Sequence, residues 1–154
     1  MNADLDCSKI SDQLYIAAWP TAQHVQIIKA LNAHLIICMF IERPAQALTQ
    51  PPFQMLHLRT FDSPFLPIPL SSLWRGVETA LPEIQARRSV LVYCKQGRHR
   101  SVAMACCILI GLGYSAEDAM KRVKEKRPAA DPGAWHIQRR IRKFEQRWQE
   151  KRDG

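Results

Sequence analysis

The feature that most constrains the fold is an apolar segment interrupted by a short cationic loop. Residues 90–94, Val-Leu-Val-Tyr-Cys, are β-prone and uncharged, which predicts a buried strand. Residues 101–112 are apolar nearly all round a helical projection, which predicts a helix enclosed on all sides. A buried strand joined by a few residues to a buried helix is typical of a parallel sheet covered by helices.

The rest of the chain alternates between strand and helix patterns. Short apolar or alternating runs predict further strands at residues 14–18, 34–40 and 53–59, and longer runs predict helices at residues 20–33, 70–87, 115–126 and 133–148. Segment 61–69 is proline-rich and predicts a loop. We therefore expect a single α/β domain over residues 1–154, with a central, mainly parallel sheet of about four to five strands and helices on both faces. Residues 1–10 are expected to form a flexible tail, and residues 149–154 a frayed end.

Composition and termini favour an ordinary globular protein. No apolar run reaches the ~18 residues of a membrane span. The first ten residues carry acids where a signal peptide needs cations, so a cytoplasmic location is expected. The five cysteines include no C-x-x-C pair, which favours free thiols over disulfides or a zinc site. We expect neither a metal nor a cofactor.

Positive charge is concentrated near the C-terminus. Residues 121–152 hold twelve Lys and Arg against four Asp and Glu, which equals the net charge of +8 of the whole chain. The simpler interpretation is a solvated helical face. The alternative is attraction to a polyanion, including weak contact of the basic C-terminal helices with an anionic membrane. No nucleic-acid motif accompanies the charge, so a nucleic-acid partner is not expected.

The loop after residue 94 has the chemistry of a phosphate-binding site. A loop that ends at a helix N-terminus directs several backbone N–H groups at one point, where negative charge is favoured. Gly97 permits a tight turn, and the Arg100 guanidinium matches two oxygens of a tetrahedral anion. The Cys94 thiolate is stabilised in the same field, so its pKa should fall below about 8.5. A thiolate held beneath a phosphoryl group predicts phosphate-monoester cleavage through a cysteinyl-phosphate intermediate.

Two further groups are needed for that reaction. The leaving oxygen needs a proton from an acid on another loop. Asp62, in the proline-rich loop, is the preferred acid, and Asp131 is the alternative. The Ser101 hydroxyl is placed to hydrogen-bond the sulfur when it departs from phosphorus.

The segment Cys94-Lys-Gln-Gly-Arg-His-Arg-Ser101 resembles the C-x5-R-[ST] loop of the cysteine-dependent protein tyrosine phosphatases, in particular the small dual-specificity type. The strand at 14–17, Asp62 with Ile68, and the segment 126–132 with Gln138 resemble other parts of that family. The resemblance implies a dual-specificity phosphatase fold, with Cys94 as nucleophile, Arg100 as phosphate clamp, Asp62 as general acid and Ser101 as helper in thiolate release. The phosphate-binding residues would be Lys95, Gln96, Gly97, Arg98, His99 and Arg100.

The sequence departs from this family at two places. Tyr93 stands where most members have a histidine, so we expect an active enzyme with a less depressed thiol pKa. Three prolines in the acid loop are expected to limit its closure. Some members carry a second cysteine that forms a disulfide with the nucleophile. Cys38 is placed for this role, although a buried core position is the simpler interpretation.

The loop cations leave the substrate open. Lys95, Arg98 and His99 are either exposed loop residues or a collar for a second anionic group. The loop is similar to those of phosphoinositide 3-phosphatases, the mitochondrial phosphatidylglycerophosphate phosphatase and inositol-pyrophosphate phosphatases. A phosphorylated protein is the preferred substrate, and a polyanionic phosphorylated lipid or small molecule is the alternative. Other hypotheses are a non-catalytic phosphate-binding module, a rhodanese-type sulfurtransferase and an adaptor that binds through the basic tail.

Overall fold

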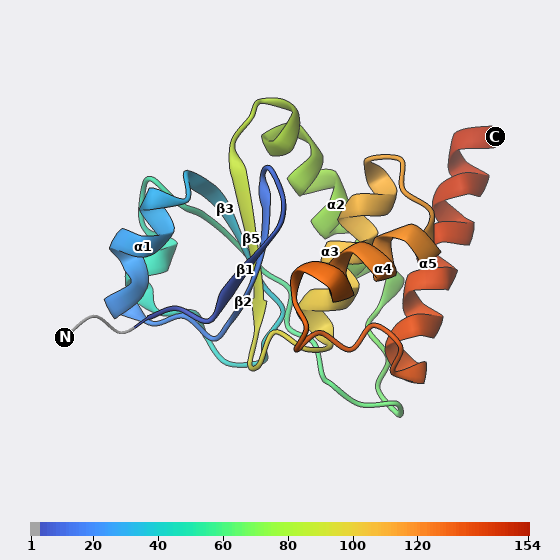
Figure 1. The fold of residues 1–154 in the computed structure, drawn as a ribbon, viewed down its shortest axis with the longest axis horizontal. Coiled ribbons are helices and arrows are strands. Elements are labelled where there is room, and N and C mark those ends of the chain that lie inside the picture. Colours follow the sequence, from blue (N-terminus) through green and yellow to red (C-terminus); the bar gives the residue numbers. More distant parts are fainter. Residues whose placement is uncertain (1–3) are drawn as a thin grey trace.

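The computed structural model describes residues 4–154 and contains a twisted sheet with helices on both faces (Figure 1). The strands are β1 (Cys7–Ser11), β2 (Leu14–Ala18), β3 (Ala33–Cys38), β4 (Gln54–His57) and β5 (Ser89–Cys94). Their order across the sheet is β1-β2-β5-β3-β4. The β1–β2 pair is antiparallel and the other neighbours are parallel. The predicted single α/β domain with a mainly parallel sheet is confirmed.

Helices cover the two sheet faces unequally. The described residues form α1 (Val25–Ala30), α2 (Leu70–Gln85), α3 (Arg100–Gly111), α4 (Ala116–Lys126) and α5 (Trp135–Asp153), with 3-10 turns η1 (Ala22–His24) and η2 (Gln46–Thr49). The α1 helix lies on one face, and α2 to α5 gather on the other (Figure 1). Side chains of a strand alternate between faces. Cys94 therefore packs in the cluster with α2 to α5, whereas Tyr93 packs in the cluster with α1.

The predicted enclosed helix is α3. Residues 100–110 are all buried, because the sheet, α2, α4 and α5 surround this helix. The next helix, α4, begins at the predicted cap, where the Ser115 hydroxyl accepts a hydrogen bond from the Asp118 N–H at 3.0 Å. These packing contacts fix the N-terminus of α3 immediately after the cationic loop.

Three predicted boundaries were wrong. Residues 7–10, expected in a flexible tail, belong to β1 and pair with β2, while residues 1–3 lie outside the described part. Within β1 only Ile10 is buried, so the hydrophobic pattern of this strand is weak. Its strand conformation is stabilised by pairing with β2. The helix expected at 20–33 is divided into η1 and the short α1. At the other end, α5 continues to Asp153 instead of fraying from residue 149.

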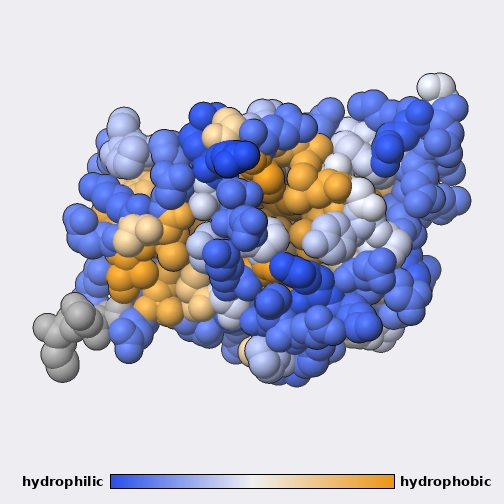
Figure 2. Space-filling view, turned by 45° about the horizontal axis from the view of Figure 1, so that its top comes forward, coloured by the Kyte–Doolittle hydropathy of each residue, from blue (hydrophilic) through white to orange (hydrophobic). Residues whose placement is uncertain are grey.

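Figure 2 shows a largely hydrophilic face with apolar surface gathered in two areas, one on the side of α1 and one on the side of α2 to α5. Across residues 4–154, none of the helices combines the length and apolar character that crossing a membrane requires.

Candidate active site

Three loops meet at the carboxyl ends of the parallel strands. They are the loop after β4, the loop between β5 and α3, and the loop before α5, drawn in green, yellow and orange at the lower edge of Figure 1. In open α/β sheets, this edge is where ligands bind. Asp62, from the first loop, and Asp131, from the third, both contact His99 in the second, at 2.8 and 3.4 Å. The predicted loop residues are thus brought together.

Cys94 ends β5 and lies at the base of this arrangement. Its side chain is buried, and its Sγ lies 3.1 Å from the Ser101 Oγ. Burial alone would raise the pKa of the Cys94 thiol. Hydrogen bonds from the Ser101 hydroxyl and from the backbone N–H groups of Ser101, Arg98 and Gly97 outweigh burial, and the pKa is lowered. These hydrogen bonds therefore stabilise the thiolate form of Cys94 relative to an unperturbed cysteine.

The shape of the loop depends on Gly97. Its φ of 65° lies in the left-handed region, and a Cβ at this position would lie 2.9 Å from the Ala17 carbonyl oxygen. A side chain here would force the loop away from β2. The turn therefore needs a glycine at this position.

A buried arginine from a distant segment supports the loop. The Arg127 side chain is only 2% exposed, and it donates from Nε to the Gly97 carbonyl at 2.7 Å and from Nη2 to the Gln96 carbonyl at 3.1 Å. Its Nη1 donates to Asp6 Oδ1 at 3.0 Å. From the sequence, Arg127 was expected only as part of the segment 126–132, and Asp6 only as part of a flexible tail. The resemblance of segment 126–132 to part of the phosphatase family pointed to this region, but the sequence did not indicate that Arg127 is buried.

Arg100 is the first residue of α3 and is 7% exposed. Its Nη1 donates to the Thr60 carbonyl at 2.9 Å, and its guanidinium lies 5.3 Å from the centre of the Phe40 ring. Its Nε is buried and has no partner within residues 4–154. One side of the guanidinium is thus anchored while a donor is left for an oxyanion.

Asp62 is held by two histidines. Its carboxylate oxygens contact His99 Nδ1 at 2.8 Å and His136 Nε2 at 2.9 Å. Burial alone would raise the pKa of the Asp62 carboxyl, but the hydrogen bonds and charges of His136 and His99 lower it. His136 was not among the site residues expected from the sequence. No local pattern could have identified it, because 74 residues separate it from Asp62.

A small pocket opens above Cys94. The residues that line it are Asp62, Cys94, Lys95, Gln96, Arg98, His99 and Arg100. Lys95 and Arg98 are exposed at its rim, whereas Gly97 is buried behind it. Asp131 lines the neighbouring pocket instead and lies 4.0 Å from the Arg98 guanidinium. Asp62 is therefore the better placed of the two acids.

Cys38 and Tyr93 lie behind the site. They are register partners on neighbouring strands, and both face α1, whereas Cys94 faces the opposite helices. Burial raises the pKa of Cys38 and of Tyr93. The buried Tyr93 hydroxyl has no hydrogen-bond partner in the part of the chain described. Stabilisation of the thiolate therefore falls on the loop amides and Ser101, and pairing of Cys38 with Cys94 stays a prediction.

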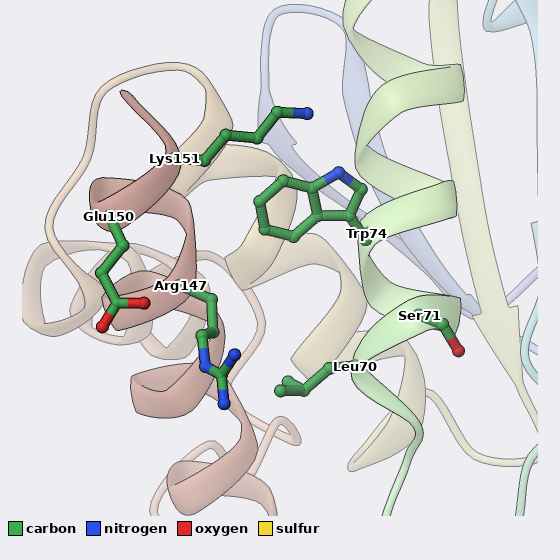
Figure 3. Close-up of a pocket in the computed structure, with 6 residues that line it drawn as sticks. All are labelled: Leu70, Ser71, Trp74, Arg147, Glu150 and Lys151. Atoms are coloured by element: carbon green, nitrogen blue, oxygen red, sulfur yellow. The ribbon is translucent and has the colours of Figure 1, made fainter. Parts of the chain in front are cut away.

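A separate cleft lies between α2 and α5 (Figure 3). Its lining residues are Leu70, Ser71, Trp74, Arg147, Glu150 and Lys151. The Lys151 ammonium lies 4.9 Å from the centre of the Trp74 ring and covers this apolar surface. The cleft shares no lining residue with the Cys94 pocket and contains no thiol or histidine, so we do not assign catalysis to it.

Comparisons with known proteins agree with this geometry. No protein-family model matches the sequence. The mouse dual specificity phosphatase 28 is 29% identical over 144 residues, which span 90% of this chain and 83% of the relative. Its human counterpart is 31% identical over 120 residues, spanning 75% of this chain and 65% of the relative. The crystal structure of a mouse dual specificity phosphatase complexed with zinc tungstate has a TM-score of 0.86 and 25% identity, covering 98% of this chain and 93% of that one.

Proposed function

Because the chain belongs to the small dual-specificity phosphatase type of the protein tyrosine phosphatase superfamily, we propose that it hydrolyses phosphate monoesters through a cysteinyl-phosphate intermediate. The observation that carries this proposal is the Cys94 thiol, whose pKa is lowered by loop amides and by Ser101 at the base of a pocket that also contains Arg100. This arrangement supports a nucleophile aligned with a bound phosphoryl group.

In the first step, the loop N–H groups and Arg100 hold the three non-bridging oxygens of the phosphate. The Cys94 thiolate attacks phosphorus, an S–P bond forms, and the bond from phosphorus to the leaving oxygen breaks. The acid form of Asp62 gives its proton to that oxygen. Approach of the phosphate dianion opposes ionisation of Asp62, which favours the protonated carboxyl that this step needs.

In the second step, water attacks phosphorus and the S–P bond breaks. Asp62, now a carboxylate, takes the proton from the water. The Ser101 hydroxyl donates a hydrogen bond to the departing thiolate, as its 3.1 Å separation from Cys94 allows. Inorganic phosphate then leaves. Because Asp62 keeps the proton from the water, Asp62 is again in its acid form and Cys94 is again a thiolate.

The preferred substrate class is a phosphorylated protein, with hydrolysis at tyrosine and also at serine or threonine. A groove next to the acid loop supports this choice, because it offers both apolar and cationic surface to a peptide. Its lining residues are Pro64, Pro67, Trp135, His136, Arg139, Arg140 and Lys143. The cytoplasmic location expected from the sequence stays part of this proposal.

The second candidate class is a polyanionic lipid or inositol phosphate. The observation in its favour is the pair of exposed cations at the pocket rim, Lys95 and Arg98, which would meet additional phosphate groups. A panel of phosphotyrosine and phosphothreonine peptides, phosphoinositides, phosphatidylglycerophosphate and inositol pyrophosphates, compared by kcat/KM, separates the two classes.

The mechanism is tested with para-nitrophenyl phosphate in the presence of EDTA. The unmodified protein should turn over this ester, and Cys94→Ser should abolish turnover while circular dichroism shows an unchanged fold. Cys7→Ser is the matched control and should keep activity, because Cys7 lies in β1 outside the pocket. Turnover by Cys94→Ser would contradict the mechanism. Binding of a phosphopeptide without turnover by the unmodified protein would support a phosphate-binding module instead.

A further inference from the structure

Three side chains from separate segments converge above the loop between β5 and α3, residues 94–100, which we call the phosphate loop. Together they offer donor atoms that suit a metal ion. Asp62 comes from the loop after β4, His99 from the phosphate loop and His136 from the first turn of α5. One potential ligand atom from each residue lies within 4.8 Å of the other two. The set contains two imidazole nitrogens and one carboxylate oxygen, a combination that Zn²⁺ accepts.

The contacts within this cluster require a proton or a cation between each ring nitrogen and the carboxylate. Each of the two contacts joins a ring nitrogen of a histidine to an oxygen of the same carboxylate. A nitrogen lone pair and a carboxylate oxygen repel one another unless a proton or a cation lies between them. A single divalent ion can therefore replace the two protons that would otherwise hold Asp62 to both histidines.

A fourth residue orients one of these ligands. The His99 Nδ1 faces Asp62, while its Nε2 lies 3.4 Å from Asp131 Oδ2. A carboxylate on the second nitrogen of a metal-binding histidine fixes the tautomer that leaves the first nitrogen free to bind the metal. The contact between His99 and Asp131 is not one of the contacts within the three-residue cluster. A carboxylate in this position, bound to the far nitrogen of a histidine ligand, is what is expected around a zinc ion.

We propose that Asp62, His99 and His136 bind one Zn²⁺ ion, with Asp131 as the outer partner of His99. Three protein ligands leave the fourth tetrahedral position open. Water or an oxygen of the anion held in the neighbouring pocket would fill it, since Asp62 and His99 also line that pocket. The ion is not a cofactor of the hydrolysis.

The consequence for activity depends on the function proposed above. Zinc on Asp62 withdraws the carboxyl that protonates the leaving oxygen. The zinc-bound protein would therefore hold phosphate but turn it over poorly, and chelation would restore turnover. The binding site itself does not depend on this consequence.

The experiment measures binding in the Cys94→Ser protein, which removes the thiolate as a competing ligand and makes the result independent of turnover. Zn²⁺ is titrated into this protein by calorimetry, and Co²⁺ absorption reports the ligand type. We expect one ion per chain, tetrahedral cobalt bands without a thiolate charge-transfer band, and weaker binding at lower pH, because both imidazoles must lose their protons.

Variants in the same background identify the ligands. His99→Asn and His136→Asn should each weaken zinc binding by at least about 10-fold, and Asp131→Asn by roughly 10-fold or less. His34→Asn is the matched control and should bind normally, because His34 is near the start of β3 and far along the strand from the site. No zinc binding by Cys94→Ser, or equal binding by His136→Asn and His34→Asn, would overturn the proposal. Circular dichroism of each variant establishes that the fold is intact.

Discussion

The two halves of the candidate active site are built differently. The phosphate loop is set by neighbours in the sequence, since Cys94, Gly97, Arg100 and Ser101 lie within eight residues and the loop joins a buried strand to a buried helix. The loop that carries Asp62 is not fixed by its sequence neighbours in this way. Asp62 lies in an exposed, proline-rich segment, and His99 and His136, from two other segments, hold its carboxylate. The position of Cys94 thus depends on the local backbone, and the position of Asp62 depends on long-range contacts.

The largest effect is expected in the local half. Arg100→Met should lower kcat/KM on the order of 10³-fold, because it removes a buried donor to the phosphate oxygens. Arg100→Lys should recover little of this loss, since an ammonium lacks the planar fork. Steady-state kinetics with para-nitrophenyl phosphate measure both variants, and full activity of Arg100→Lys would show that charge alone is enough.

A smaller effect is expected from the acid. Asp62→Asn should lower kcat/KM by ~10²-fold for an alkyl phosphate, which needs a proton on its leaving oxygen. The loss should be much less for an aryl ester with a good leaving group. Asp131→Asn is the matched control, and a larger loss in that variant would transfer the acid role to Asp131.

Support of the phosphate loop by a distant side chain is tested through stability. Arg127→Met should reduce the free energy of unfolding by about 2 kcal/mol, because it leaves buried carbonyl groups without donors. It should also lower activity, since Arg127 donates to the Gly97 and Gln96 carbonyls. Urea denaturation compares it with Arg142→Met, whose side chain on α5 is exposed. Equal stability of these variants would mean that the loop keeps its shape without Arg127.

The smallest effect is expected from the residue that assists the sulfur. Ser101→Ala should slow hydrolysis of the intermediate by roughly 10-fold, the loss of one hydrogen bond to a charged group. Rapid-quench experiments should show a burst of product followed by slow turnover, with phosphate retained on Cys94. Ser101→Thr keeps the hydroxyl and should behave normally; a burst in this variant as well would assign the effect to packing.

The fold around Cys94 could be predicted from the sequence because neighbouring residues determine it. The strand, cationic loop and enclosed helix around Cys94 follow from hydrophobic pattern and spacing, and the position of Asp62 follows from its loop. The roles of Arg127 and His136 could not be predicted, because they depend on tertiary contacts. Arg127 contacts Gly97, 30 residues away, and His136 contacts Asp62, 74 residues away. Sequence analysis also missed β1, whose order comes from pairing with β2 and not from its own pattern.

Tyr93 illustrates the same limit within the strand. The sequence places a tyrosine before Cys94 where related enzymes have a histidine, and we expected the pKa of the thiol to be less depressed for that reason. Alternation along β5 instead places its hydroxyl on the α1 side, next to Cys38 and away from the phosphate loop. Which face a side chain occupies depends on register, and here register decides its chemistry.

The central claim is that loop amides and Ser101 lower the pKa of the Cys94 thiol, and alkylation by iodoacetamide across pH tests it most directly. Only this thiol should react at low pH, because burial raises the pKa of Cys38, Cys106 and Cys107, and that of Cys7 to about 11. We predict a midpoint for Cys94 clearly below that of an unperturbed cysteine, an upward shift of this midpoint in Ser101→Ala, and no such reaction in Cys94→Ser. A midpoint at or above that of an unperturbed cysteine in the unmodified protein would contradict this claim.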